Sequence, residues 1–303
     1  MTPCYNEEGN IRSVYLAIKD VFSRTNYTYE HIIIDNNSTD GTQTILREIA
    51  AQDRNVKVIF NYKNFGQANS PYYATLLAEG EAVITYMSDM QDPPELILEF
   101  IKKWESGHDI VVGIKRKAPD RFLMKYLKKI YYMMIGLIAE NGHMENFSGF
   151  GLYDKSFINV LRQLNIQIPY FRGLVSDYGR NICRVTYDQN ERRKGRSKNN
   201  FWSLFDYAMV GFVSQSRIPL RISIFTGFIF AFINLLISFG YFIYKLLYWD
   251  EFQLGIAPAV IGIFFFFSLQ LIFIGIMGEY VGVIYAHVKQ KPLVIEKERL
   301  NFD

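Results

Sequence analysis

Cysteine is scarce in this sequence of 303 residues, and long blocks of like charge are absent. The two cysteines, Cys4 and Cys183, are too far apart for a zinc motif or a small disulfide-bonded domain. The net charge is only +3 and Lys and Arg form no basic stripe, so no nucleic-acid partner is expected. With 50% hydrophobic and 21% charged residues, the chain is not intrinsically disordered. These absences leave a folded protein in a reducing compartment.

Charge is nearly absent from residues 222–288, which hold four charged side chains against 59 in the other 236 residues. Within this region, residues 222–247 and 256–284 each exceed the about 20 apolar residues that cross the hydrocarbon layer of a bilayer. Residues 263–269 lack a polar face, which disfavours the alternative of two buried helices in a soluble core. No cleavable signal peptide precedes them. The sequence therefore predicts two transmembrane helices.

The charges that flank these two segments predict their orientation. Arg217 and Arg221 precede the first segment, Lys289 and Lys291 follow the second, and the linker at residues 249–251 (Trp-Asp-Glu) is negative. Cytoplasmic flanks carry the excess of Lys and Arg, so both chain ends are expected in the cytoplasm.

Four regions follow from these patterns. Residues 201–213 combine aromatic side chains with few charges, which fits an amphipathic helix in the membrane interface or an ordinary packed helix. We therefore expect a cytoplasmic domain over residues 1–200, an interfacial or juxtamembrane segment over 201–221, a two-helix membrane domain over 222–288 and a cytoplasmic tail over 289–303.

The first 200 residues alternate between strand and helix patterns. We predict strands at 31–35, 56–60, 82–87 and 109–113, with helices at 42–52 and 66–79. Strands joined by helices indicate a mostly parallel sheet, whose ligands sit at the carboxyl ends of the strands. The sequence has neither the Gly-x-Gly-x-x-Gly nor the Gly-x-x-x-x-Gly-Lys motif, so dinucleotide redox chemistry and P-loop hydrolysis lose support.

An oxygen-rich turn follows the predicted strand at 82–87. Asp89, Gln91 and Asp92 offer three oxygen ligands within four residues, and Pro93 and Pro94 make the exit rigid. Hard divalent cations prefer oxygen ligands and usually bind substrate phosphates as well. The pattern indicates a cation site, with a solvated acidic turn as the alternative.

Five motifs together resemble the family 2 glycosyltransferases that act on polyprenyl phosphate, such as bactoprenol glucosyltransferases and dolichol-phosphate mannose synthases. The resemblance runs nearly end to end. It implies a GT-A nucleotide-sugar domain, an inverting mechanism and a Mg²⁺ or Mn²⁺ ion. The motifs are Pro-Cys-Tyr-Asn-Glu-Glu at 3–8, Asp-Asn-Asn-Ser-Thr-Asp-Gly at 35–41, Lys-Asn-Phe-Gly at 63–66, Asp-Met-Gln-Asp-Pro-Pro at 89–94 and Gly-Glu-Tyr-Val-Gly at 278–282.

The resemblance also implies roles for individual residues. Asp35 would contact the base, although a helix cap is the alternative, and Asp89 with Gln91 would hold the metal that bridges the donor diphosphate. An aromatic at position 65 could also simply pack in the core. The residues expected to bind the nucleotide sugar are Pro3, Tyr5, Asn6, Glu7, Asp35, Asn64, Gly66 and Asp89.

Two further segments match the family pattern. Residues 147–154 (Phe-Ser-Gly-Phe-Gly-Leu-Tyr-Asp) end in Asp154, which with Asp89 is the catalytic candidate, and a cap for the following helix is its alternative. Residues 192–198 (Arg-Arg-Lys-Gly-Arg-Ser-Lys) carry donors suited to phosphate oxygens or to anionic lipid headgroups. The residues expected to bind phosphate or lipid are Arg172, Arg192, Ser197 and Lys198.

Three departures from the family pattern bear on these expectations. Met1 stands two residues before Pro3, so the first strand is shorter than the family's, and either the start is misassigned or the sheet lacks a central element. Met87 occupies the place of the first acid of an Asp-x-Asp pair, which predicts weaker metal affinity. Asn36 and Val283 replace an acid and an arginine.

The resemblance leads to a specific expected activity. We expect transfer of one hexose, with UDP-glucose the preferred donor, to polyprenyl phosphate such as the undecaprenyl lipid on the cytoplasmic face of a bacterial plasma membrane. Alternatives are another donor (GDP-mannose, a UDP-N-acetylhexosamine or a modified pentose) or a catalytically impaired membrane scaffold. A homo-oligomer is suggested by the resemblance alone.

Overall fold

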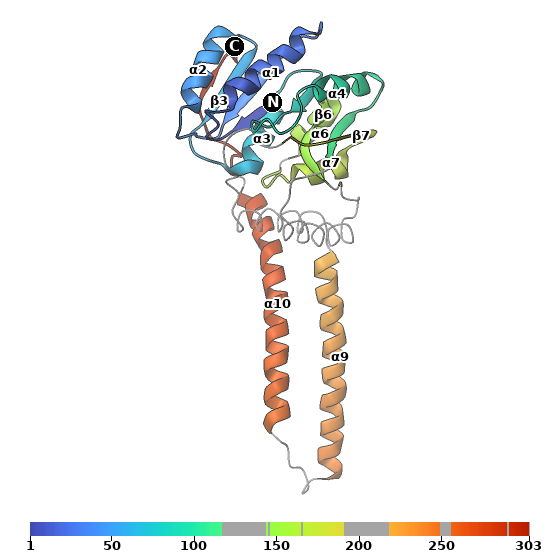
Figure 1. Cartoon of the computed structure of the whole chain (residues 1–303). Helices are drawn as coiled ribbons and strands as arrows, with labels where there is room; N and C mark the ends of the chain where they lie inside the picture. The colour runs from blue at the N-terminus through green and yellow to red at the C-terminus, as the bar shows by residue number, and fades with distance from the viewer. Residues whose placement is uncertain are drawn as a thin grey trace.

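The computed structural model describes residues 1–116, 144, 146–164, 166–190, 218–248, 256–289 and 291–302. An α/β body holds both chain ends, and two long helices leave it side by side (Figure 1). The strands of the body form two four-stranded sheets, with orders β1-β2-β3-β8 and β4-β6-β5-β7.

The first sheet confirms the predicted parallel strands. β1 (Thr2–Cys4), β2 (His31–Asp35) and β3 (Val56–Asn61) run parallel, and they are linked by α1 (Ile11–Ser23) and α2 (Thr42–Gln52). α1 buries apolar side chains at helical spacing, and every residue of β2 is buried. A strand that is covered on both faces reads as a continuous apolar run, which is why the pattern at 31–35 was recognisable.

The second sheet is mixed, so the prediction of a mostly parallel sheet is wrong for this half. β6 (Phe147–Asp154) lies between β4 (Ala82–Thr85) and β5 (Ile110–Lys115) and is antiparallel to both, whereas β7 (Ile182–Tyr187) is parallel to β5. α4 (Leu96–Glu105), α6 (Lys155–Gln163) and α7 (Phe171–Tyr178) pack on this sheet, whereas α3 (Gly66–Leu77) packs on β1 and β2 and against α6.

One residue connects the two sheets. The amino group of Met1 donates to the Ile84 carbonyl at 2.7 Å, and the Tyr86 N–H donates to the Met1 carbonyl at 2.9 Å. This pair of bonds is that of a parallel ladder in which Met1 faces Thr85. β1 itself has three residues, and the ladder that Met1 forms with β4 is this single step.

The two long helices are α9 (Ile218–Leu247) and α10 (Ile256–Lys289). Within the described residues, Phe265–Lys289 is the one segment long and apolar enough to cross a membrane, and Leu220–Asn234 of α9 is apolar but shorter. The ring of Phe230 contacts that of Phe265 at a centroid distance of 6.2 Å. Large apolar side chains elsewhere on both helices are exposed, for example Phe228 at 72%. A span on α10 is therefore supported, and a span on α9 stays a prediction.

The C-terminal tail, expected only to be cytoplasmic, returns to the body as β8 (Glu296–Leu300). β8 is antiparallel to β3, with Asn61 beside Glu296 and Val58 beside Leu300. Asn301 then donates to the carbonyls of Ala50 and Val56, each at 2.8 Å. The tail thereby covers the outer edge of the first sheet.

The Asn301 side chain should contribute more to stability than the exposed ion pair between Arg47 and Glu298. Asn301→Ala removes two hydrogen bonds to backbone carbonyls and should lower the free energy of unfolding by about 1–3 kcal/mol. Glu298→Ala removes a partner of Arg47 at the surface and should cost about 1 kcal/mol or less. Urea unfolding of both variants in detergent measures the difference, and equal costs would contradict this role of Asn301.

The Met1 amino group should make stability depend on pH. Burial lowers its pKa from 8.0 to about 5, against the attraction of Glu30. The unfolded chain therefore binds more protons between pH 5 and 8, so the free energy of unfolding should rise with pH in this window, by at most about 1.4 kcal/mol per unit. Burial lowers the pKa of His31 from 6.5 to about 3, so His31 adds to the same slope below about pH 7, and unfolding between pH 7 and 8 reports mainly the amino group. Acetylation of Met1 should abolish the slope, and an unchanged slope would contradict the assignment.

Candidate active site

The loops that follow β1 and β2 are hydrogen-bonded to each other at the carboxyl edge of the first sheet. Asn6 takes a left-handed conformation with φ of 55°. Its N–H donates to Ser38 Oγ at 2.8 Å, and its Oδ1 accepts from the Thr39 N–H at 2.7 Å. The Glu7 N–H donates to Thr42 Oγ1 at 2.9 Å. The structure thus brings Pro3, Tyr5, Asn6 and Glu7 to one edge with the loop after β2, and their binding of a nucleotide sugar stays a prediction.

Asp35 stabilises this loop from inside instead of facing solvent. Its side chain is completely buried. Its carboxylate accepts from the Ser38 N–H at 3.0 Å, from the Ser38 hydroxyl and from Gln43 Nε2 at 2.7 Å. In this structure Asp35 therefore stabilises the loop, which is close to the capping alternative. A contact between Asp35 and the base stays a prediction.

A network of amide side chains joins the loops after β2 and β3. Asn36 Nδ2 donates to Asn64 Oδ1 at 2.8 Å, and Asn61 Nδ2 donates to Asn36 Oδ1 at 3.0 Å. The Phe65 N–H also donates to Asn36 Oδ1, at 2.9 Å. Gly66 has φ of 88°, and an added Cβ would meet no atom within 4 Å, so its backbone faces open space. Sequence analysis treated Asn36 only as a missing acid and did not identify this network.

The turn after β4 carries the predicted cation ligands. Asp89 and Gln91 are both partly exposed, whereas Met90 between them is buried, with a left-handed φ of 57°. The Gln91 N–H donates to Asp89 Oδ1 at 3.3 Å. The left-handed residue lets two neighbouring polar side chains share the exposed face of the turn.

Asp92 holds this turn to the core through a buried hydrogen bond. It is 3% exposed and accepts from the Tyr187 hydroxyl at 2.5 Å. Burial raises the pKa of Asp92, while the charge of Lys115 and the bond from Tyr187 act in the opposite direction. Asp92 is therefore a structural acid, and sequence reasoning had grouped it with the exposed ligands.

The oxygen ligands of this turn suit a cation that substrate phosphates also bind. The described residues contain no cluster of three His, Cys, Asp or Glu side chains that could hold a metal by themselves. Asp89 offers one carboxylate and Gln91 one amide oxygen, while Met87 supplies no oxygen. Mg²⁺ is commonly bound by one or two carboxylates, water and substrate phosphates, so these residues fit the ion as a partial site.

Asp154 lies at the opposite edge of the sheet from Asp89. In the antiparallel pair of β4 and β6, Asp154 is beside Ala82 at the start of β4, whereas Asp89 follows the end of β4. Asp154 is the N-cap of α6, where it accepts from the Ser156 N–H at 2.7 Å and from Trp104 Nε1 at 2.8 Å. Burial would raise the pKa of Asp154, but these hydrogen bonds leave it lowered. The prediction that Asp154 is the catalytic base is therefore corrected to a helix cap.

The start of β6, not its end, approaches the turn that carries Asp89. Gly149 has φ of 97°, and a Cβ there would lie 3.9 Å from the Met87 side chain. The Gly149 carbonyl accepts from the Tyr153 hydroxyl at 2.8 Å and from the Thr85 hydroxyl. Within the segment 147–154, it is therefore Gly149 and not Asp154 that lies near the turn after β4.

The remaining predicted residues are placed only in part. Arg172 is in α7, whose first residue Phe171 contacts the ring of Tyr153 at a centroid distance of 5.0 Å. Arg192, Ser197 and Lys198 lie outside the described residues. The last described residue before them, Asn190, donates its N–H to the Gln91 carbonyl at 2.9 Å.

The carboxyl edge of the first sheet lies toward α10. β8 begins next to Asn61 at the end of β3, and the Tyr62 N–H donates to the Ile295 carbonyl at 2.9 Å. α10 ends at Lys289, and the residues that join it to Glu296 can span at most about 25 Å. The polar loops are therefore on the side of the body from which the long helices leave (Figure 1).

These features agree with a comparison to known proteins. The family described as "Glycosyl transferase family 2" matches residues 1–164. The chain belongs to this family. Its domain is a GT-A-like α/β fold with a mixed sheet.

Similar proteins cover nearly the whole chain. The "Uncharacterized glycosyltransferase sll0501" of Synechocystis is 31% identical over 97% of this chain and 92% of its own length. The "SfII prophage-derived bactoprenol glucosyl transferase" of Shigella flexneri is 30% identical over 98% of this chain and 96% of its own length. A solved mannosyl-3-phosphoglycerate synthase from Rubrobacter xylanophilus, 14% identical with a TM-score of 0.50, covers 73% of this chain and 72% of its own and shares the fold.

Substitution of Asp154 should distinguish a role as helix cap from a role as catalytic base. Asp154→Ala should lower the free energy of unfolding by about 0.5–2 kcal/mol, because the Ser156 N–H loses its acceptor, and should leave glycosyl transfer nearly unchanged. Asp154→Ser should restore the stability, since serine also caps helices. A fall in transfer of about 100-fold in both variants, with normal folding, would reinstate Asp154 as a base.

Proposed function

We propose that this glycosyltransferase moves one hexose, with glucose from UDP-glucose the preferred donor, to a polyprenyl phosphate at the cytoplasmic face of the membrane. The observation that carries the proposal is the position of the polar carboxyl edge on the side of the body from which α10 leaves. The donor would be bound at this edge. A lipid phosphate at the membrane surface would therefore meet the donor sugar there.

The loops that line this edge carry several acids. An anionic donor is therefore expected to bind there together with a cation. Glu7, Glu8, Asp40 and Asp89 all come from the loops that line this edge. A nucleoside diphosphate would be repelled by these acids unless positive charge lies between them. We expect Asp89 and Gln91 to hold Mg²⁺ or Mn²⁺, which would neutralise charge on the departing diphosphate.

The segment 192–198 is the expected second source of positive charge. It follows Asn190, which is bonded to the turn that carries Asp89 and Gln91. Guanidinium and ammonium donors suit phosphate oxygens, so Arg192, Ser197 and Lys198 are expected to bind the lipid phosphate, the diphosphate or both.

The acceptor chemistry requires little from a general base. A phosphate monoester has its second pKa near about 6, so the acceptor is mostly a dianion at neutral pH. Its oxygen can displace the nucleoside diphosphate from the anomeric carbon once the two are aligned. Positioning and leaving-group stabilisation then supply most of the acceleration. This agrees with a site in which Asp154 is remote.

α9, α10 and the returning tail support the proposed membrane arrangement. Two spans would return the chain to the side of the bilayer on which it began. β8 could then pair with β3, as it does in the structure. The flanking Arg and Lys residues favour the cytoplasm for that side. Relatives named bactoprenol glucosyl transferase, such as that of Shigella phage SfX at 29% identity over 99% of this chain, support the lipid acceptor and the glucose donor.

A donor screen tests the proposal. Full-length protein in vesicles that contain undecaprenyl phosphate would be given labelled UDP-glucose, GDP-mannose, a UDP-N-acetylhexosamine or a nucleotide-linked modified pentose. We expect label in the lipid fraction from UDP-glucose, dependent on both the lipid phosphate and the cation. Transfer from another donor would change the sugar assignment, and no transfer from any donor would favour a membrane scaffold.

Asp89→Asn tests the cation site. The variant should lower transfer by about 100-fold and raise the Mg²⁺ or Mn²⁺ concentration needed for half-maximal rate, because one carboxylate ligand is lost. Glu95→Gln is the matched control, since Glu95 is an exposed acid just after the same turn. Titration of the cation in the transfer assay gives both values. An unchanged cation requirement in Asp89→Asn would remove Asp89 from the site.

A further inference from the structure

The turn at residues 86–95, which joins β4 to α4, is hydrogen-bonded to the end of a distant strand. Asp92 in this turn accepts from the hydroxyl of Tyr187, the last residue of β7, which lies 95 positions further along the chain. Asn190, three residues after Tyr187, is bonded to Gln91 through its backbone N–H and its carbonyl. The end of β7 therefore contacts the turn beside both residues.

Tyr187 is packed tightly on its own side of this contact. Its side chain is 5% exposed, and its ring meets that of Phe150 edge-on at a centroid distance of 5.9 Å. A Cβ added to Gly113 of β5 would lie 2.9 Å from the same ring, so the neighbouring strand has no room for a side chain there. A ring enclosed in this way has little freedom to move its hydroxyl, which makes Tyr187 a rigid support for Asp92.

The buried carboxylate of Asp92 depends on this hydroxyl. It accepts from Tyr187 at 2.5 Å and from Gln189 Nε2 at the longer distance of 3.5 Å. A buried carboxylate that loses its shorter hydrogen bond is costly, so without Tyr187 we expect the turn to shift and bring Asp92 toward solvent. Asp89 and Gln91 would move with it, because they belong to the same turn.

The backbone of Asn190 orients the side-chain amide of Gln91. The Asn190 N–H donates to the Gln91 carbonyl at 2.9 Å, and Gln91 Nε2 donates to the Asn190 carbonyl at 3.4 Å. A carbonyl accepts only from a donor, so the amide nitrogen of Gln91 faces Asn190 and the amide oxygen faces away from it. Divalent cations of this class bind the oxygen of an amide. The contact therefore favours the orientation in which Gln91 can act as a ligand.

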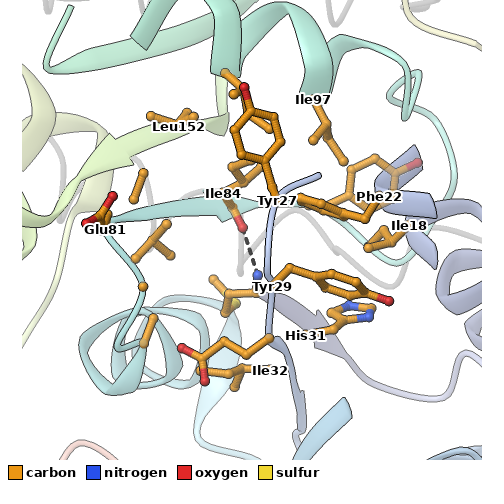
Figure 2. A pocket seen from close by; sticks show the side chains of 18 of the residues that line it. Ile18, Phe22, Tyr27, Tyr29, His31, Ile32, Glu81, Ile84, Ile97 and Leu152 are labelled. Carbon is orange, nitrogen blue, oxygen red and sulfur yellow. Dashed lines mark hydrogen bonds between the residues drawn. The ribbon is translucent and has the colours of Figure 1, made fainter. Parts of the chain in front are cut away.

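The elements on either side of the turn constrain it less than the end of β7 does. Ile84 of β4 and Ile97 of α4 both line a cavity of about 430 Å³ (Figure 2). Side chains beside a cavity have fewer packing contacts than side chains in a filled core. The hydrogen bonds that the turn itself makes therefore have a large part in fixing its position.

We propose that Tyr187 is a positioning residue of the cation site. Its hydroxyl, through Asp92, holds the turn in the conformation that binds a divalent cation together with the donor diphosphate. The backbone of Asn190 fixes the Gln91 amide in the same conformation. This inference rests on the cation site of the proposed function. Tyr187 acts on the fraction of molecules whose turn is ready to bind the cation, and the apparent dissociation constant rises as that fraction falls.

Binding of Mn²⁺ to full-length protein in detergent tests the proposal without glycosyl transfer. Free Mn²⁺ is measured by electron paramagnetic resonance at a fixed concentration of UDP or GDP, with the nucleotide alone as reference. Tyr187→Phe should raise the Mn²⁺ dissociation constant by about 10-fold. Tyr72→Phe is the matched control and should bind as the wild type does, because the buried Tyr72 hydroxyl donates to the Leu161 carbonyl, between α3 and α6. An unchanged constant in Tyr187→Phe would overturn the proposal.

Asp92 variants distinguish positioning from direct binding of the cation. Asp92→Asn keeps an oxygen that can accept from Tyr187, so it should retain most of the Mn²⁺ affinity, whereas Asp92→Ala should lose about 10-fold. Tyr187→Phe combined with Asp92→Ala should weaken binding no further than either change alone, since both remove the same bond. Additive losses would overturn the proposal. So would an equal loss in Asp92→Asn and Asp92→Ala, because the Asp92 charge would then act on the cation directly.

Asn190 offers a test that leaves the core untouched, since it is exposed and bonds to Gln91 through its backbone. Asn190→Pro removes the N–H and should raise the Mn²⁺ dissociation constant by about 5-fold, whereas Asn190→Ala keeps the N–H and should bind as the wild type does. Equal binding by these two variants would overturn the role of Asn190. Wild-type protein that binds no Mn²⁺ with either nucleotide would refute the cation site itself and this proposal with it. Wild-type binding that Tyr187→Phe leaves unchanged would refute only the positioning role.

Discussion

The backbone bonds of Met1 to β4 are the constraint on which the rest of the body depends. They hold the first sheet against the second through one parallel step. That step aligns the ends of β1, β2 and β4, so the loops that follow them meet at one edge. The arrangement of the polar edge thus depends on backbone bonds at Met1, several residues away from the loops that are expected to bind the donor.

The tail makes a second connection, between this edge and the membrane helices. β8 pairs with β3 over Val58–Asn61, and its first residue lies at the carboxyl end of β3. Because α10 precedes β8 by only a few residues, the helix leaves from the side where the polar loops are. The charged C-terminal tail, by pairing with β3, therefore determines the side from which a lipid headgroup would approach.

Local pattern was sufficient for much of the fold. The buried run at 31–35, the helix at 42–52 and the two apolar helices all stand where the sequence predicted them, because their periodicity depends on burial that the residues themselves require. The loops at 3–8, 35–41 and 89–94 likewise gather at one edge. Strand direction was not predictable in this way, since a strand pattern is the same read forwards or backwards.

That ambiguity explains the error at Asp154. Had β6 been parallel to β4, its last residue would lie at the edge with Asp89; it is antiparallel, so Asp154 caps α6 at the other edge and Gly149 lies beside Met87. Asp35 and Asp92 were identified as acids in a turn, but only packing decides that their carboxylates are buried and bonded within the protein. Residue type and spacing determined which groups are available for chemistry and that two helices are apolar. The tertiary structure decided which of those groups face solvent, because direction and burial arise from contacts between segments far apart in the chain.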